Sequence, residues 1–159
     1  MARELTLLFH FLGFGLLMTV NLAGIILNGQ YKKAADLPSK AMILRSLRPI
    51  GLLSPVGMLV MLVTGIGNMQ ALGFGLLDAG WLTAKIIFFG IAVISGILFG
   101  MKAKRRGTLV QQMASGKAAA NAPEILAGYD KQISLFYIVM AILMIVILSL
   151  AIYGRLGGQ

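Results

Sequence analysis

Four long apolar segments dominate the chain, at about residues 5–27, 50–69, 81–101 and 132–153. Each is close to or above the ~20 apolar residues that a helix needs to cross a bilayer. Inside the hydrocarbon no water can bond the backbone, so a spanning segment of this length must satisfy its polar groups as a helix. The pattern therefore predicts an all-α, integral membrane four-helix bundle, built as a single transmembrane domain over residues 1–159.

The basic residues fall in the first and third connections between these segments. The second connection, residues 70–80, contains Asp78 and no basic residue. The basic residues of the other two are Lys32, Lys33, Lys40, Arg45 and Arg48, and then Lys102, Lys104, Arg105, Arg106, Lys117 and Lys131. Short loops rich in Lys and Arg stay in the cytoplasm. We therefore expect both termini on the outer side of a bacterial cytoplasmic (inner) membrane.

Composition agrees with this assignment and excludes several classes of function. The chain is 58% hydrophobic and 12% charged, whereas a soluble domain has about a quarter of its residues charged. The net charge of +9 would raise nucleic-acid binding in a soluble protein, but here the cations lie between membrane segments. They indicate contact with anionic lipid headgroups and no nucleic-acid partner. The absence of cysteine excludes disulfides and thiolate metal sites.

Residues 40–48 form an amphipathic stretch within the first connection, in which apolar and basic side chains alternate. Ser39 stands directly before the stretch and is a residue type that caps helices. We expect a short helix over Lys40 to Arg48 that lies along the cytoplasmic interface. Its cations would face the lipid headgroups.

Polar residues inside membrane segments are costly and therefore informative. In the first segment, steps of three or four residues place one imidazole and two amides on a single helical face. This face consists of His10, Phe14, Leu17, Asn21, Gly24 and Asn28. We expect it to point into the bundle, with the two amides bonded to a neighbouring helix.

Lys85 is the one charged residue of the third segment and follows Trp81 by four positions. At ~1.5 Å per residue it lies about 6 Å below that aromatic anchor. The first and third segments both begin on the outer side, so His10 and Lys85 share one layer of the outer leaflet. Two other interpretations stay open: Lys85 can extend its stem to the headgroups, and His10 can bond a carbonyl or water.

Three parts of the sequence resemble one group of membrane proteins. They are the run of residues 6–21 with its early histidine, the basic and then proline-containing stretch 43–64, and Trp81-Leu82-Thr83-Ala84-Lys85. Together they resemble the four-helix HemJ-type protoporphyrinogen oxidases and the related copper-resistance D proteins. The resemblance covers most of residues 5–105.

The resemblance implies oxidation of protoporphyrinogen IX to protoporphyrin IX with a b-type haem. His10 and Lys85 match the essential histidine and lysine of the group. His10 would be the axial metal ligand and Lys85 the partner of a propionate. Because the chain has one histidine, the sixth ligand would be a methionine such as Met69. Asn21 would be a further cofactor contact.

Two other classes of function stay open at this stage, and the sequence does not decide whether the chain is an enzyme. One is a non-catalytic small subunit or assembly factor of a larger membrane complex, in which the polar face serves helix packing or a homo-oligomer. The other is transport of copper or of a small solute. Four helices leave little room for the inverted repeat that many transporters contain.

The topology can be tested by labelling single cysteines, because the chain has no native cysteine. An impermeant thiol reagent added to intact cells should label Ala79→Cys and should leave Ser115→Cys unlabelled until the cells are opened. The reverse pattern would show that the orientation is inverted.

Overall fold

The computed structural model describes residues 2–157. Its helices are α1 (Ala2–Lys33), α2 (Leu37–Gly51), α3 (Leu53–Leu72), α4 (Gly80–Ala114) and α5 (Ala122–Arg155). The described part of the chain contains no strand, and four helical stretches are long and apolar enough to cross a membrane, with α2 and α3 forming one of them. The prediction of an all-α four-helix bundle is confirmed.

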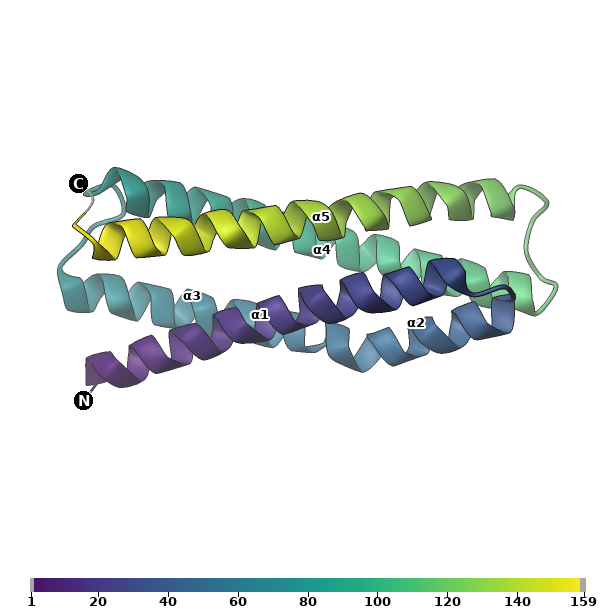
Figure 1. The fold of residues 1–159 in the computed structure, drawn as a ribbon, viewed down its shortest axis with the longest axis horizontal. Helices are drawn as coiled ribbons and strands as arrows, with labels where there is room; N and C mark the ends of the chain where they lie inside the picture. The colour runs from purple at the N-terminus through teal and green to yellow at the C-terminus, as the bar shows by residue number, and fades with distance from the viewer. Residues whose placement is uncertain (1, 158–159) are drawn as a thin grey trace.

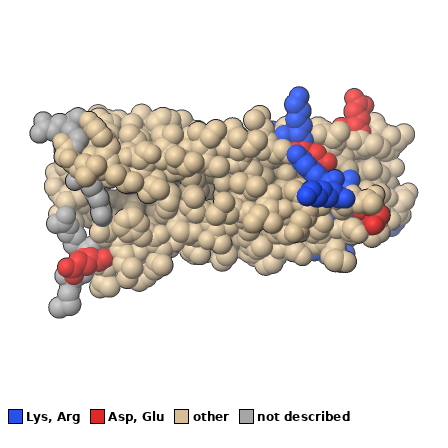
Figure 2. Space-filling model, viewed as in Figure 1, with Lys and Arg blue, Asp and Glu red and all other residues tan. Residues whose placement is uncertain are grey.

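The helices run side by side along one long axis (Figure 1). Both termini and the α3–α4 connection lie at one end, and the α1–α2 and α4–α5 connections lie at the other. We call this second end the basic end, because the Lys and Arg atoms visible in Figure 2 gather toward it, whereas the middle of that face carries no charge. Both basic connections thus lie on the same side of the apolar band.

Two helices are much longer than the bilayer requires. α4 has 35 residues and α5 has 34, or about 50 Å each, against ~30 Å of hydrocarbon. The sequence pattern predicts that the third span ends near Met101 and that the fourth begins near Gln132. The helices extend further, because α4 continues to Ala114 and α5 begins at Ala122. Charge ends a membrane span without ending a helix, because Lys, Arg, Gln and Ala are all good helix formers.

The helix expected over Lys40 to Arg48 is present, but its cap differs from the prediction. α2 begins at Leu37, and its N-cap is Asp36 rather than Ser39. The Asp36 carboxylate accepts the Ser39 backbone N–H at 2.7 Å and the Ser39 hydroxyl at 3.0 Å. These two bonds hold the pKa of Asp36 below its usual value. Ser39 therefore donates to the cap instead of forming it.

The expectation that this helix lies along the membrane interface is wrong. α2 continues the course of α3 along the bundle, and it packs against α1 and α4 (Figure 1). Its Leu37, Ala41 and Leu44 cover a buried cluster that contains Tyr31 and Val110. Because α4 extends beyond the apolar band, it offers α2 an apolar surface to bury against, which competes with the lipid interface.

Four of the five helices form two close pairs, α1 with α3 and α4 with α5, and the Cα atoms of α3 and α4 come close at few points. Glycine sets the distance within the first pair. A Cβ at Gly13 would lie 3.2 Å from the carbonyl oxygen of Gly57, and one at Gly57 would lie 3.1 Å from that of Gly13. A larger residue at either position would push the two backbones apart.

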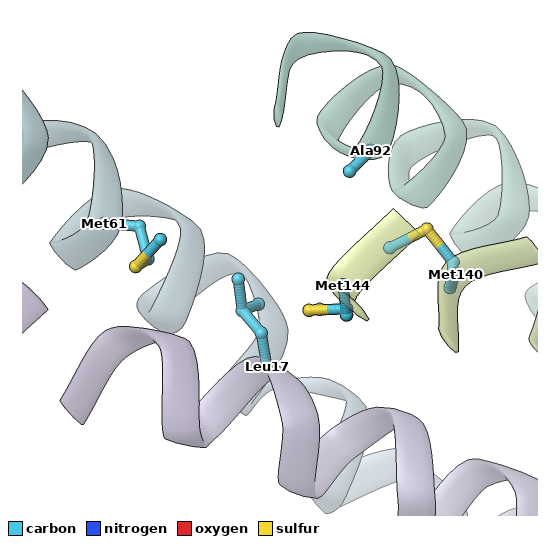
Figure 3. Close-up of a cluster of buried hydrophobic side chains, with 5 residues drawn as sticks. All are labelled: Leu17, Met61, Ala92, Met140 and Met144. Carbon is cyan, nitrogen blue, oxygen red and sulfur yellow. The ribbon is translucent and has the colours of Figure 1, made fainter. Parts of the chain in front are cut away.

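The core between the pairs is drawn from four helices. Figure 3 shows its buried members, which are Leu17 of α1, Met61 of α3, Ala92 of α4, and Met140 and Met144 of α5. Unbranched methionine side chains suit this irregular space.

The inward face predicted for α1 is confirmed. Leu17, Asn21, Gly24 and Asn28 are buried, whereas Leu12 on the opposite side is about half exposed, at 53%. Because lipid covers that exposed side, a long apolar side chain there needs no protein partner.

The contact between α1 and α5 predicts an intolerance of side chains at Gly24. A Cβ there would lie within 3.0 Å of three atoms of Tyr137, whose ring packs at an angle against both Phe99 and Phe136. Gly24→Ala should destabilise the protein by about 1–3 kcal/mol in a detergent unfolding titration. Gly29→Ala meets no atom within 4 Å and should be neutral or stabilising by up to about 1 kcal/mol. Equal effects would refute this packing.

Candidate functional site

His10 bonds a neighbouring helix through one ring nitrogen. Its Nδ1 lies 2.9 Å from Oγ1 of Thr64 on α3, and the Thr64 hydroxyl is also bonded to the carbonyl oxygen of Val60. A hydroxyl has one proton, and a carbonyl can only accept. Thr64 therefore donates to Val60 and accepts the N–H of His10 Nδ1. This assigns a proton to Nδ1, and in the neutral form of the ring Nε2 then carries the lone pair.

Gly65 makes room for this imidazole. A Cβ at Gly65 would stand 3.5 Å from Cε1 of His10, so the half-buried ring rests against the α3 backbone. The sequence contains Thr64 and Gly65 as a conspicuous pair in the second apolar segment. Their contact with His10 depends on the packing of α1 against α3, which the sequence alone does not show.

The other residues predicted for a cofactor site fall at different places. Lys85 is partly buried on α4 and lies near enough to His10 for its charge to act on the imidazole. Met69 is half-buried on α3, one turn beyond Gly65. Asn21 lies eleven positions after His10, about 16 Å further along α1. The structure therefore groups His10 with Lys85 and separates Asn21 from them.

A central cavity of about 290 Å³ lies between the two helix pairs. Its lining is mostly apolar and includes the rings of Phe14, Phe89 and Phe136. Asn21 also lines it, and Oδ1 of this buried amide has no hydrogen-bond partner in the described part of the chain. The bond to a neighbouring helix that the sequence predicted is found for Asn28 but not for this oxygen of Asn21. His10, Lys85 and Met69 are not among its lining residues.

A second pocket of about 500 Å³ lies between α2 and α4 at the basic end. We call it the basic pocket. Four cationic residues line it, and its lining contains no carboxylate. They are Arg45 and Arg48 of α2 with Lys104 and Arg106 of α4.

Arg106 is the buried charge of the bundle, with 2% of its surface exposed. Its NH1 group donates to Oδ1 of Asn28 at 2.9 Å and to Oδ1 of Asp130 at 3.2 Å. Its guanidinium also lies over the ring of Tyr31, 4.4 Å from the centroid. One cation thus connects α1, α4 and α5.

The remaining polar groups around Arg106 are also bonded to one another. The Asn28 amide donates to the Ser134 hydroxyl at 3.3 Å, and that hydroxyl donates to the Asp130 carbonyl at 2.7 Å. The sequence pattern placed Arg106 among the basic residues of the third connection and did not reveal this network. The spacing of Asp130, Ser134 and Tyr137 was the available signal, since it continues the inward face of the fourth segment toward the basic end.

The residues present offer one nitrogen that suits a haem iron, the Nε2 lone pair of His10. In the described residues, no group of three or more His, Cys, Asp or Glu side chains could hold a metal ion by itself. A scan against protein-family models and searches of curated proteins and of solved structures find no match to this chain. The resemblance to the HemJ-type group therefore stays a hypothesis carried by its own residues.

The Arg106 network predicts a large difference between two adjacent arginines. Arg106→Met leaves the Asp130 carboxylate and the Asn28 amide without their partner. It should cost about 3 kcal/mol of unfolding free energy in detergent, at the lower end for a broken buried pair because Asp130 is 25% exposed. Arg105→Met, at an exposed position, should change stability by less than about 0.5 kcal/mol. A similar small change in both variants would show that the network does not stabilise the bundle.

Proposed function

We propose that this multi-pass membrane protein binds a haem or porphyrin, with His10 as an axial ligand through Nε2. The observation that carries the proposal is the chain of hydrogen bonds from His10 Nδ1 through Thr64 to the Val60 carbonyl. Histidines that ligate metals almost always donate their other ring N–H to a fixed acceptor, which sets the tautomer and the ring orientation. The same bond leaves Nε2 available to a ligand when the ring is neutral.

Lys85 is the second residue of the proposed site. Its charge acts on His10, and a lysine ammonium forms charged hydrogen bonds with carboxylates. A porphyrin propionate would be such a carboxylate and would give the ligand a preferred orientation. The resemblance of residues 81–85 to the HemJ-type group supports the same role. The proposal rests on His10 and Lys85, because Asn21 lies about 16 Å along α1 from the histidine.

A bound haem would supply one-electron chemistry, which no side chain of this sequence provides by itself. The contribution of the chain is to keep His10 neutral and oriented and to hold the propionate end at Lys85. Oxidation of protoporphyrinogen IX is the reaction that the resemblance favours for such a site.

We also propose an orientation and a compartment. By the positive-inside rule the basic end faces the cytoplasm, so that His10 and Lys85 lie in the outer leaflet of a bacterial inner membrane. Contact of the exposed apolar residues of α1, α3, α4 and α5 with lipid agrees with this placement in the bilayer.

The haem proposal can be tested by absorbance of the purified full-length protein after expression with excess haem precursor. A Soret band should be present, and His10→Ala should abolish it. Thr64→Val keeps the shape of the side chain but removes the acceptor for Nδ1, and it should weaken haem affinity about 10- to 100-fold. Thr19→Val is the matched control, because the Thr19 hydroxyl also bonds a carbonyl one turn earlier, that of Gly15, but contacts no histidine.

The role of Lys85 can be tested with a separate variant. Lys85→Met keeps a long stem and removes the charge, so it should weaken binding of haem but have less effect on a porphyrin dimethyl ester, which carries no propionate charge. A folded protein that stays colourless under these conditions, or a Soret band unaffected by both His10→Ala and Lys85→Met, would contradict the proposal. Such a protein would better fit an accessory subunit of a larger complex.

A further inference from the structure

We infer that the basic pocket and the central cavity together bind one anionic phospholipid. Its phosphate would lie in the basic pocket, and an acyl chain would lie in the cavity. This site is separate from His10 and Lys85, so the inference does not depend on haem binding.

The polar half of the site is matched to a phosphate. Arg45 and Arg48 approach from α2 and Lys104 from α4, and the lining contains no carboxylate that would repel an anion. Arg and Lys are the side chains that bind phosphate oxygens through charged hydrogen bonds. A phosphate placed among them would therefore meet cations from two different helices.

Arg106 adds a fixed positive charge to the wall of the basic pocket. The residue lines the pocket, and its NH1 group is held by Asn28 and Asp130. Its Nε is buried and has no hydrogen-bond partner in the described part of the chain. Because Nε is buried, an anion in the pocket would be attracted by the charge of the guanidinium and would not bond Nε directly.

The apolar half of the site is continuous with the polar half. Leu47, Phe99, Gly100 and Tyr137 line both the basic pocket and the central cavity. The path between the two therefore runs past apolar side chains and past a glycine. An amphiphile with one charged end and one apolar end matches this sequence of surfaces better than a free phosphate, which would fill only the basic pocket.

The charged and apolar parts of the site follow each other in the same order as the headgroup and chains of a lipid in the bilayer. Arg45 and Arg48 come just before the second apolar segment, and Lys104 comes just after the third. The cations thus lie at the border of the apolar band, and the cavity lies within it. A phospholipid of the adjacent leaflet has the same order of headgroup and chains, so it would enter without turning over.

The surface of α4 at Gly100 provides the route of entry. One turn away α3 and α4 touch, because a Cβ at Gly96 would lie 2.7 Å from the Met58 side chain. At the position shared by the two pockets, a Cβ at Gly100 would meet no atom within 4 Å. An acyl chain could pass there from the surrounding lipid into the cavity.

The charge requirement can be tested by native mass spectrometry of the full-length protein in detergent. Phosphatidylglycerol and phosphatidylcholine with identical chains are added in separate titrations. We expect one phosphatidylglycerol to bind with about tenfold or greater preference over phosphatidylcholine. Arg48→Gln/Lys104→Gln should abolish this preference. Lys32→Gln/Lys33→Gln removes the same number of charges from exposed positions outside both pockets and should retain it.

The requirement for an acyl chain in the central cavity can be tested with two glycines of α4. Gly100→Leu fills the passage between the pockets without changing charge, and it should reduce phosphatidylglycerol binding at least tenfold. Gly90→Leu also adds its side chain where a Cβ meets no atom within 4 Å, but Gly90 lines neither pocket, so binding should be unchanged. Thermal midpoints of all variants identify any that fail to fold, and the arginine–lysine variant then carries the test.

Four results would overturn the inference. The first is equal binding of the two lipids, and the second is an equal loss of binding in the two double variants, which would indicate attraction by net charge alone. The third is unchanged binding in folded Gly100→Leu, because the lipid would then lie on the surface. Inorganic phosphate at millimolar concentration should displace little lipid. Full displacement would assign the pocket to a free anion and would also overturn the inference.

Discussion

The absence of water within the bilayer is the constraint from which the rest of this structure follows. Each backbone N–H and carbonyl in the apolar band must be bonded within its own helix, which is why the described chain is almost entirely helical. The same constraint acts on side chains. His10 bonds Thr64, Asn28 bonds Arg106 and Ser134, and each of these partners lies on a different helix. Polar residues thus determine which helices meet.

The bundle is held together differently along its length. Within the first pair, the glycine contact of Gly13 and Gly57 brings two backbones together and gains dispersion energy from close packing. At the basic end, Arg106 joins α1, α4 and α5, and α2 covers the adjoining Tyr31 cluster. In between, unbranched Met140 and Met144 fill the space incompletely. The cavity is what remains where neither glycine contacts nor the polar network draws the pairs together.

This division leaves two chemically different groups of side chains toward opposite ends of the bundle. Near the termini, the imidazole of His10 is bonded to Thr64 and lies near enough to Lys85 for its charge to act on the ring. Near the two basic connections, cations from α2 and α4 border an opening that leads to an apolar interior. The first arrangement suits coordination, since a lone pair is directed by a hydrogen bond on the far side of the ring. The second suits an amphiphile, since charge and apolar surface follow each other in the order of a lipid.

The sequence by itself determined the four spans, the end at which the cations gather, and the inward face from His10 to Asn28. Lipid exposure and helical period act within one segment, so the residues of that segment are sufficient to read them. Only the tertiary structure decided the bond from His10 to Thr64, 54 positions away, and the bond from Arg106 to Asn28, 78 positions away. It also decided the course of α2 and the cavity. An arginine in a basic stretch has the same local pattern whether it is solvated or buried, because its burial depends on the acceptors that other helices bring to it.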